Sequence, residues 1–546
     1  MNRLRPVLPW LALLLGLVAL THDLWSRPGE VFAGKLSTDT MLTAWFHLRV
    51  AAGPLPETLD DFDFPQAYET AREFPSTADA LLLRPLVRAL GFPGYWNAAV
   101  VLAVGFAGLG TAAAAASLGV GPRGVLLAGL LGALCRPLWF EALSARFNAI
   151  YPGLLLLGAA LGGWAIRRPG WGRLPLMAVG VALGVAALWV YPPWALILLP
   201  LLVAIALPAL RDGDAAGRGL FFVGLLLAGG LLVWLLPEAV EARVTGQQCL
   251  RLRCPDRYHS VDVLDLLRST VEPKEGLARG GLYLAPWLLA PLALWRRRWV
   301  GGGLLLGALG LALLAVGPCP QLGGEPVLQG VFAHDPGGMP GLWCLLGRVT
   351  DHGRFATGAG LALAVLCALG VEAVGDGGRL RQALGWALGA GVVAWVATVH
   401  LTGMNDPRRW HVPEVPPPAR FLAEAAPGVA AELPFDRSEQ FLSVLAASGR
   451  PRVNPLKKRP RPRSGDPVVD WLNALGVGDV AEPPTPAALA ETHVRWVVWD
   501  PGRCGLPSVP RLACHPSIAV RLAATLGSPV WQEGQALAFE VNALAR

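Results

Sequence analysis

Residues 150–191 read IYPGLLLLGAALGGWAIRRPGWGRLPLMAVGVALGVAALWVY, with an apolar run on either side of a basic turn. About 20 apolar residues in a helix cross the roughly 30 Å hydrocarbon core of a bilayer, and both runs approach that length. The turn between them carries three arginines, Arg167, Arg168 and Arg173. Arginines in short loops stay on the cytoplasmic side, so the pattern predicts a pair of membrane helices joined inside the cell.

The same pattern recurs along the chain of 546 residues, of which 53% are hydrophobic and only 16% charged. A soluble protein would carry about 25% charged residues. The fold class predicted is mainly α, a polytopic transmembrane helix bundle of about eleven spans. The spans are expected at about 6–21, 95–118, 123–141, 149–166, 174–191, 193–210, 219–236, 281–295, 300–317, 355–374 and 383–402.

Charge in the loops tests this count. With the N-terminus inside, each predicted inner segment contains arginine. These arginines are Arg3 and Arg5; Arg123; Arg167, Arg168 and Arg173; Arg211 and Arg218; Arg296, Arg297 and Arg298; Arg379 and Arg381. We therefore predict a multi-pass protein of the inner (plasma) membrane with a cytoplasmic N-terminus. The net charge of +7 is explained by orientation, and nucleic acid is not expected as a partner.

Four outer segments follow from the alternation. The transmembrane domain is expected over 1–402, with outer loops at 22–94, 237–280 and 318–354, and the fourth outer segment is the tail, 403–546. The first run, 6–21, has the basic flank of a signal peptide, but no small-x-small cleavage site precedes His22, so we predict a retained helix.

Cysteines fall in pairs on the predicted outer side. The pairs are Cys249 with Cys254, Cys319 with Cys344, and Cys504 with Cys514, whereas Cys135 and Cys367 lie inside spans. Paired outer cysteines are typical of disulfides in an oxidising compartment. The rival, a zinc site, lacks the CxxC spacing, so no metal ligands and no cofactor are assigned, and metal dependence stays unknown.

The tail changes composition. Residues 403–418 form a Pro-rich linker, and 419–546 are expected to form a small extracytoplasmic α/β domain. Helices are predicted at 419–426, 437–447, 487–491 and 517–526, strands at 429–434 and 494–499, and a hairpin around Gly534 at 529–541. Neither a Walker loop nor GxSxG or HExxH occurs, so ATP or metal hydrolysis is not indicated.

The first outer loop opens with GKLSTDTMLTAWFHLR, residues 34–49, in which Asp39 precedes an amphipathic stretch. A carboxylate held at the membrane surface would suit a general base for glycosyl transfer. The alternative is structural, because Ser37, Thr38 or Asp39 could simply start the helix that follows.

Two further groups are candidates. Asp60, Asp61 and Asp63 form an acidic cluster that would either hold a divalent cation or lie in a solvated loop. Arg348, His352 and Arg354 stand where a late span begins. The guanidinium fork matches phosphate oxygens, so this block would clamp a phosphate or, alternatively, anchor the helix start at headgroups.

The chain resembles the GT-C superfamily of integral membrane glycosyltransferases, particularly its poorly characterised bacterial members. The resemblance is carried by Ser37-Thr38-Asp39 with the aromatic helix after it, Phe62-Asp63-Phe64-Pro65, Leu90-Gly91-Phe92-Pro93 with Tyr95-Trp96-Asn97, His352-Gly353-Arg354-Phe355, and the tail segments Ala431-Glu432-Leu433-Pro434-Phe435 and 494–499. It implies transfer of a sugar from a polyprenyl-phosphate donor to a glycan, lipid or protein acceptor on the non-cytoplasmic face.

The resemblance also implies roles for particular residues. Asp39 matches the first-loop acid, and His352 and Arg354, with Arg348 less closely, match the basic groups that hold the donor phosphate. The family often has a second acid, for which Asp23, Asp60, Asp61 and Asp63 are equal candidates. The alternative is a non-catalytic scaffold or a polysaccharide-export or transport component. Few charges lie inside the spans, which disfavours an ion-coupled transporter.

Overall fold

A computed structural model describes residues 8–27, 33–34, 38–54, 58–59, 68–69, 78–143, 147–235, 261, 263–264, 266, 282, 284–317, 321–322, 325–326, 352–404, 417–434, 453, 464–479, 481–505 and 511–541. It contains two compact units, which are described separately. The first is Met1–Gly34 with Pro93–His411, and the second is Lys35–Phe92 with Val412–Arg546.

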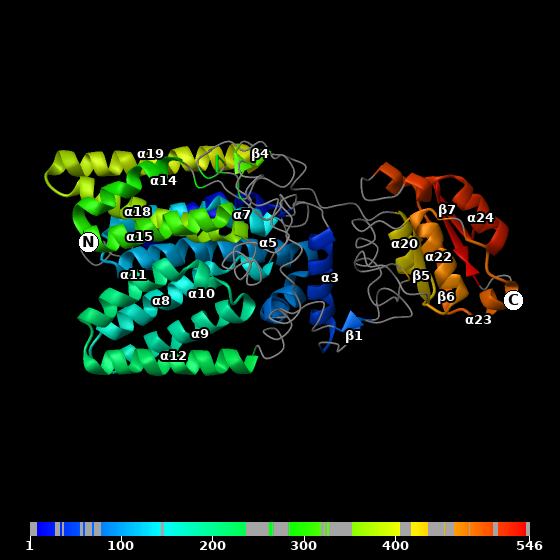
Figure 1. The fold of residues 1–546 in the computed structure, drawn as a ribbon, viewed down its shortest axis with the longest axis horizontal. Helices are drawn as coiled ribbons and strands as arrows, with labels where there is room; N and C mark the ends of the chain where they lie inside the picture. The colour runs from blue at the N-terminus through cyan, green and yellow to red at the C-terminus, as the bar shows by residue number, and fades with distance from the viewer. Residues whose placement is uncertain are drawn as a thin grey trace. The chain divides into compact units, whose positions relative to one another are not determined.

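The first unit is a helix bundle (Figure 1). Its elements are α1 (Leu8–Leu20), α2 (His22–Ser26), the later part of α5 (Ala78–Ser117), α6 (Pro122–Ala133), α7 (Arg136–Leu143), η1 (Phe147–Ala149), α8 (Pro152–Arg167), α9 (Arg173–Val190), α10 (Trp194–Ile197), α11 (Leu199–Asp212), α12 (Ala215–Leu235), α14 (Leu284–Leu289), η3 (Ala290–Leu292), α15 (Ala293–Val316), η4 (His352–Arg354), α18 (Phe355–Gly375) and α19 (Arg379–Met404). Two short hairpin strands, β3 (Gln321–Leu322) and β4 (Glu325–Pro326), pair antiparallel.

Among the described residues, 7 helices are long and apolar enough to cross a membrane. They are Ala78–Ser117, Pro122–Leu143, Arg173–Val190, Ala215–Val233, Arg297–Val316, Phe355–Gly375 and Arg379–Thr398. The prediction of a multi-pass membrane protein built mainly of helices is thus confirmed. Some predicted spans form shorter helices because proline interrupts them: 193–210 becomes α10 and α11 around Pro200, and 281–295 becomes α14, η3 and the start of α15 around Pro286 and Pro291.

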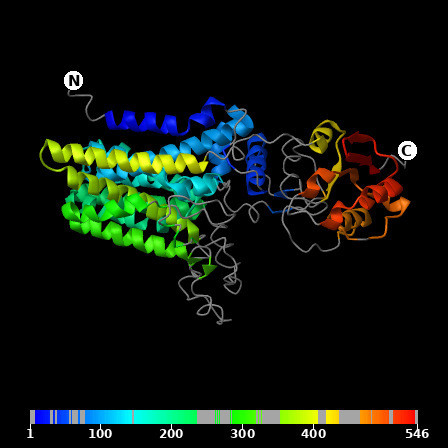
Figure 2. The same cartoon turned by 90° about the horizontal axis from the view of Figure 1, so that it is seen from above.

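Helix α18 is the centre of the bundle. It packs against α15, α6 and α19, and nearly all of its side chains from Phe355 to Val371 are buried. Small residues allow this, because a Cβ on Gly358 would lie 2.2 Å from the carbonyl oxygen of Ile197. By contrast α12 carries many exposed apolar side chains, as expected for a helix that faces lipid. Figure 2 shows α1 along the bundle, where it packs against α6.

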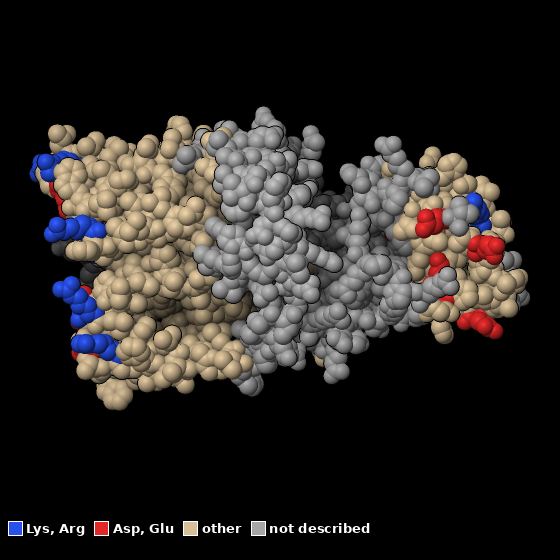
Figure 3. Space-filling view, in the orientation of Figure 1, with Lys and Arg blue, Asp and Glu red and all other residues tan. Residues whose placement is uncertain are grey.

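Basic side chains gather at one end of the bundle, which we call the arginine end (Figure 3). The α8–α9, α11–α12 and α18–α19 connections lie there. Arg167 donates to the carbonyl oxygen of Ser117 at 2.7 Å, and Arg297 donates to that of Leu118, so both cap the C-terminus of α5. Trp171 and Trp299 are exposed beside these arginines, as tryptophans are at a membrane interface.

The opposite end, which we call the far end, follows from chain direction. Helix α9 runs toward it and α8 and α18 start from it, because each of these three is joined at its other terminus to the arginine end. Helix α7, which follows α6, lies toward the far end in Figure 1.

In the second unit, α3 (Thr38–Ala52) is followed by the strand pair β1 (Thr58–Leu59) and β2 (Tyr68–Glu69) and by the first part of α5. Arg88 donates to the carbonyl oxygen of Ala51 and Arg84 to that of Gly53, both at 2.8 Å, so α5 caps the C-terminus of α3. Helix α5 is broken at Gly91, whose φ of 59° favours glycine, and this break coincides with the boundary between the units.

The tail contains a four-stranded sheet with the order β5-β6-β8-β7. Its elements are α20 (Pro417–Glu424), β5 (Val429–Leu433), α22 (Pro467–Val477), α23 (Pro486–Glu491), β6 (Val494–Trp499), η6 (Pro501–Gly505), η7 (Arg511–Cys514), α24 (Ser517–Leu526), β7 (Trp531–Glu533) and β8 (Ala536–Glu540). Strands β5 and β6 pair in parallel, and β8 pairs antiparallel with β6 and β7.

This arrangement confirms the predicted α/β class of the tail. The strands at 429–434 and 494–499, the hairpin and the helices at 419–426, 487–491 and 517–526 all form, whereas the helix expected at 437–447 lies outside the described residues. One helix was not predicted. In α22, Asp466 accepts from the amide of Val468 at 2.8 Å, Pro467 is the first helical residue, and Gly478 ends the helix in the left-handed conformation.

Two cysteine predictions are tested by the described residues. Cys504 and Cys514 form a disulfide. Cys135, between α6 and α7, and Cys367, within α18, are buried free thiols. Two other pairs were predicted, and both lie outside the described residues: Cys249 with Cys254, and Cys319 with Cys344.

Candidate functional site

The far end of the bundle holds a buried polar cluster around Arg354. Its Nε lies 3.3 Å from Glu141 Oε2, and the two side chains are 13% and 3% exposed. Its Nη1 donates a hydrogen bond to the hydroxyl of Tyr191. The guanidinium carbon is also 4.8 Å from the centroid of the Tyr191 ring, within the range of a cation–π contact. We call Arg354, Glu141 and Tyr191 the Arg354 cluster.

The three residues of the Arg354 cluster come from three separate elements of the bundle. Arg354 ends η4, so it stands directly before α18. Tyr191 caps α9, where the following Pro192 and Pro193 stop the helix, and its amide donates to the carbonyl oxygen of Ala187 at 3.0 Å. Glu141 lies in α7, close to its last residue, Leu143. The residues are 213 and 163 positions away from Arg354 in sequence, so only the fold unites them.

Glu141 is positioned by a break between α6 and α7. The break falls at Leu134 and Cys135, and the indole nitrogen of Trp139 donates across it to the carbonyl oxygen of Ala133 at 2.7 Å. This contact fixes the direction of α7 and therefore of the carboxylate that it carries. Proline at 137 is tolerated because it falls in the first turn of the new helix, where no amide donor is needed.

The Arg354 cluster pairs a buried positive charge with a buried negative one. A buried carboxylate and guanidinium lose their hydration, and the pair is retained only with good geometry and added hydrogen bonds such as the one to Tyr191. An arginine held in this way presents a planar fork that matches phosphate oxygens.

Aromatic side chains enclose this end of the bundle. Trp194, which is fully buried, meets the ring of Tyr191 edge to face with centroids 5.5 Å apart. Thr357 lies one turn into α18 from Arg354 and is also fully buried, and its hydroxyl has no hydrogen-bond partner among the residues the structure describes. A polar centre within an apolar wall strengthens each interaction, because the local dielectric is low.

The predicted site residues divide into three groups. Arg354 belongs to the cluster. His352 lies beside it in η4, and Asp39 and Asp23 lie in α3 and α2, but for these three the structure describes only the backbone. Arg348, Asp60, Asp61 and Asp63 lie outside the described residues.

Asp39 is the second residue of α3, which begins at Thr38. A carboxylate in the first turn favours the positive end of the helix dipole, as the structural interpretation requires. The same position leaves a general-base role open.

Sequence reasoning missed Glu141 and Tyr191. A signal existed for the first, since Glu141 is the one acidic residue of the span predicted at 123–141, and ionisable residues within spans tend to be functional. The acids expected from the sequence all lie in the first outer loop, whereas Glu141 lies in α7. The Tyr-Pro-Pro sequence at 191–193 indicated a turn, but it did not indicate that Tyr191 contacts Arg354.

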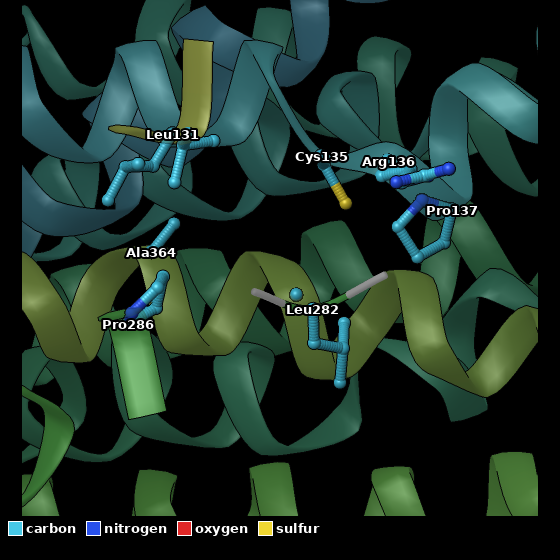
Figure 4. Close-up of a pocket in the computed structure, with 9 residues that line it drawn as sticks. Leu131, Cys135, Arg136, Pro137, Leu282, Pro286 and Ala364 are labelled. Carbon is cyan, nitrogen blue, oxygen red and sulfur yellow. The ribbon is translucent and has the colours of Figure 1, made fainter. Parts of the chain in front are cut away.

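Two further features of the described residues bear on what the site can hold. No group of three or more metal-ligating side chains occurs among the described residues. A gap of about 20 Å³, room for about one water, lies at the α6–α7 break and is lined by Leu131, Cys135, Arg136, Pro137, Leu282, Pro286, Gly360, Ala364 and Val396. Figure 4 shows the Cys135 sulfur pointing into this gap, which is apolar and separate from the Arg354 cluster.

Comparison by sequence finds no relative. No family model matches the chain. No curated protein sequence matches it either.

Comparison of folds does find similar structures. The apo oligosaccharyltransferase of Archaeoglobus fulgidus matches with a TM-score of 0.51 at 13% identity, over 91% of this chain and 70% of that one. ArnT from Cupriavidus metallidurans in the apo state matches with a TM-score of 0.50 at 12% identity, over 99% of this chain and 98% of that one. ArnT bound to undecaprenyl phosphate matches with 0.51 at 13%, over 98% of each chain. The chain therefore has the fold of these GT-C membrane glycosyltransferases.

Proposed function

We propose that this protein is a membrane glycosyltransferase that moves a sugar from a polyprenyl-phosphate donor to an acceptor glycan, lipid or protein. The observation that carries the proposal is the Arg354 cluster, because a buried arginine beside a carboxylate and a phenol suits the phosphate of such a donor. ArnT, which shares the fold, is a protein that binds undecaprenyl phosphate.

The proposed orientation follows from the positive-inside rule. The arginine end faces the cytoplasm, so the Arg354 cluster lies toward the non-cytoplasmic face of the inner membrane. The tail domain is extracytoplasmic, a compartment in which the Cys504–Cys514 disulfide persists.

The proposed reaction is a direct displacement at the anomeric carbon. The acceptor oxygen forms a bond to that carbon while the bond from the carbon to the phosphate oxygen breaks. Asp39 takes the acceptor proton as general base. Arg354, aided by His352 and Arg348, stabilises the charge that develops on the departing lipid phosphate. Glu141 joins Asp23, Asp60, Asp61 and Asp63 as a candidate second acid.

The alternative is a scaffold or export component that keeps the fold without the chemistry. The buried Glu141–Arg354 pair favours an enzyme over such a component, because burying charges costs stability that a purely structural role does not require.

The test compares a deletion strain complemented with wild-type protein, Asp39→Asn, and the control Asp212→Asn, whose carboxylate is exposed at the arginine end. We expect Asp39→Asn to lower envelope glycan output by about 10²-fold or more at normal protein level, as for loss of a general base. Asp212→Asn should match wild type. Native mass spectrometry with added undecaprenyl phosphate should show that Asp39→Asn still binds the lipid. Unchanged glycan output from Asp39→Asn at equal protein level would contradict its assignment as the base.

A further inference from the structure

The chain segment that carries α3 is joined to the bundle at a narrow base. The first unit ends at Gly34 and resumes at Pro93, so residues Lys35–Phe92 form an excursion of the chain between these two points. At the base, the amide of Ala33 donates to Asn97 Oδ1 at 2.9 Å. The indole nitrogen of Trp96 donates to the carbonyl oxygen of Ala33 at 2.7 Å. We call these two hydrogen bonds the Trp96–Asn97 clamp.

The residues of the Trp96–Asn97 clamp are buried. Ala33 and Trp96 are fully buried and Asn97 is 2% exposed. Two consecutive side chains at the start of the bundle part of α5 thus satisfy both backbone groups of one residue, although they project about 100° apart around the helix. Buried backbone groups need partners, but solvent or secondary structure usually supplies them, and here two side chains do so.

The clamp is also in contact with the support of the Arg354 cluster. The ring of Trp96 meets that of Phe147 edge to face with centroids 4.1 Å apart. Phe147 begins η1, which packs against α7, and α7 carries Glu141. The Trp96–Phe147 contact and the packing of η1 against α7 therefore link the clamp to the helix that carries Glu141.

We infer that Trp96 and Asn97 are positioning residues for the reaction, which close the base of the 35–92 excursion and so restrict where Asp39 can lie. The inference rests on the proposed function. Asp39 follows Ala33 by six residues, which span at most about 20 Å when extended. With Ala33 fixed by the clamp, the point at which the 35–92 excursion leaves the first unit is fixed as well.

Loss of the clamp should reduce productive alignment without removing the donor site. Asn97→Leu removes the acceptor, and Trp96→Phe removes the donor while it keeps a ring against Phe147. We expect both to lower the transfer rate about 10- to 100-fold, since misplacement by about 1 Å can cost 10²-fold. The concentration of polyprenyl-phosphate donor giving half-maximal rate should change by less than about 2-fold, because the contacts of Arg354 are intact.

The chain offers matched controls. Asn97→Asp keeps the Oδ1 acceptor and should stay within about 3-fold of wild type, as rescue by a conservative variant. Trp395→Phe makes the same substitution as Trp96→Phe at a tryptophan that is 54% exposed on α19, and it should have no effect.

Hydrogen exchange of the full-length protein provides a readout that does not depend on activity. The Ala33 amide should exchange slowly in wild type and at least about 10-fold faster in Asn97→Leu, because a buried hydrogen bond is lost. Binding of undecaprenyl phosphate, measured by native mass spectrometry, identifies the variants that have kept their fold. If Asn97→Leu does not fold, Trp96→Phe replaces it in the exchange and rate measurements.

The outcomes separate the two ideas. Unchanged exchange at Ala33 in Asn97→Leu would overturn the clamp itself. Faster exchange with an unchanged transfer rate would overturn the positioning role while leaving the proposed function intact. Full activity of Asp39→Asn would instead remove the reaction on which the inference rests. Faster exchange, a slower rate and unchanged donor dependence together support the inference.

Discussion

The two ends of the helix bundle use arginine in different ways. At the arginine end, Arg167 and Arg297 donate to backbone carbonyls at the C-terminus of α5, and Arg173 pairs with an Asp214 side chain that is 53% exposed. At the far end, Arg354 is buried with Glu141 and Tyr191. The arginines of the arginine end lie among other basic side chains. Arg354 instead contacts a carboxylate from α7 and a phenol from the end of α9.

The difference teaches that one chain can hold arginine in two ways, by backbone carbonyls and exposed ion pairs at one end and by buried side-chain partners at the other. Exposed ion pairs contribute little to stability and are screened by salt. A buried pair is costly to form and costly to break. Substitutions at the two ends should therefore differ in kind as well as in size.

The largest expected contrast is in activity. Arg354→Lys keeps a positive charge but loses the planar fork, so we expect transfer to fall by about 10²-fold or more, the scale seen when one charge-stabilising donor is removed. Arg173→Lys at the arginine end should stay within about 2-fold of wild type. Initial rates per amount of protein in isolated membranes provide the measurement. Equal rates for Arg354→Lys and wild type would remove the distinction between the ends.

A second contrast concerns stability. Glu141→Leu leaves Arg354 buried without its carboxylate and should lower the free energy of unfolding by about 3 kcal/mol. The double variant Glu141→Leu with Arg354→Met replaces both charges by apolar groups and should recover most of that loss while staying inactive. Thermal melting in detergent, together with the transfer rate, tests this. If the double variant were no more stable than the single one, the pair would not be coupled as the geometry indicates.

Sequence patterns predicted the ends of the bundle unequally. The arginine end was predictable because the positive-inside rule acts on short loops that are local in sequence, as at Arg167 and Arg379. The cluster was predictable only for Arg354, which stands at the start of a span. Glu141 and Tyr191 join it through tertiary packing over long separations, and no local pattern encodes that pairing.

The tail illustrates a different reason for success and failure. Strands β5 and β6 were predicted because short runs rich in valine and tryptophan are bounded by turn residues. Helix α22 was not predicted, although Asp466, Pro467 and Gly478 mark its start and end. It directly follows a basic, Pro-rich stretch whose composition indicates a loop. Asp39 was placed correctly at a helix start, but its role stays a prediction.

The smallest effect is expected for Asp214, which lies in the turn between α11 and α12. The hydrogen bond from Arg173, with help from the amide of Gly217, lowers the pKa of this carboxyl group from 3.8 to about 2. Because the pKa in the folded state is depressed, the stabilisation is fully present above about pH 4 and is lost as the pH falls toward 2. Asp214→Asn keeps an oxygen for the helix start of α12 but removes the charge. Melting curves from pH 5 to 8 should therefore show a constant and small difference from wild type, because nothing at this site titrates there. A difference that changes across that range would mean that Asp214 is coupled to a group elsewhere, and that the arginine end is not the passive counterpart of the Arg354 cluster.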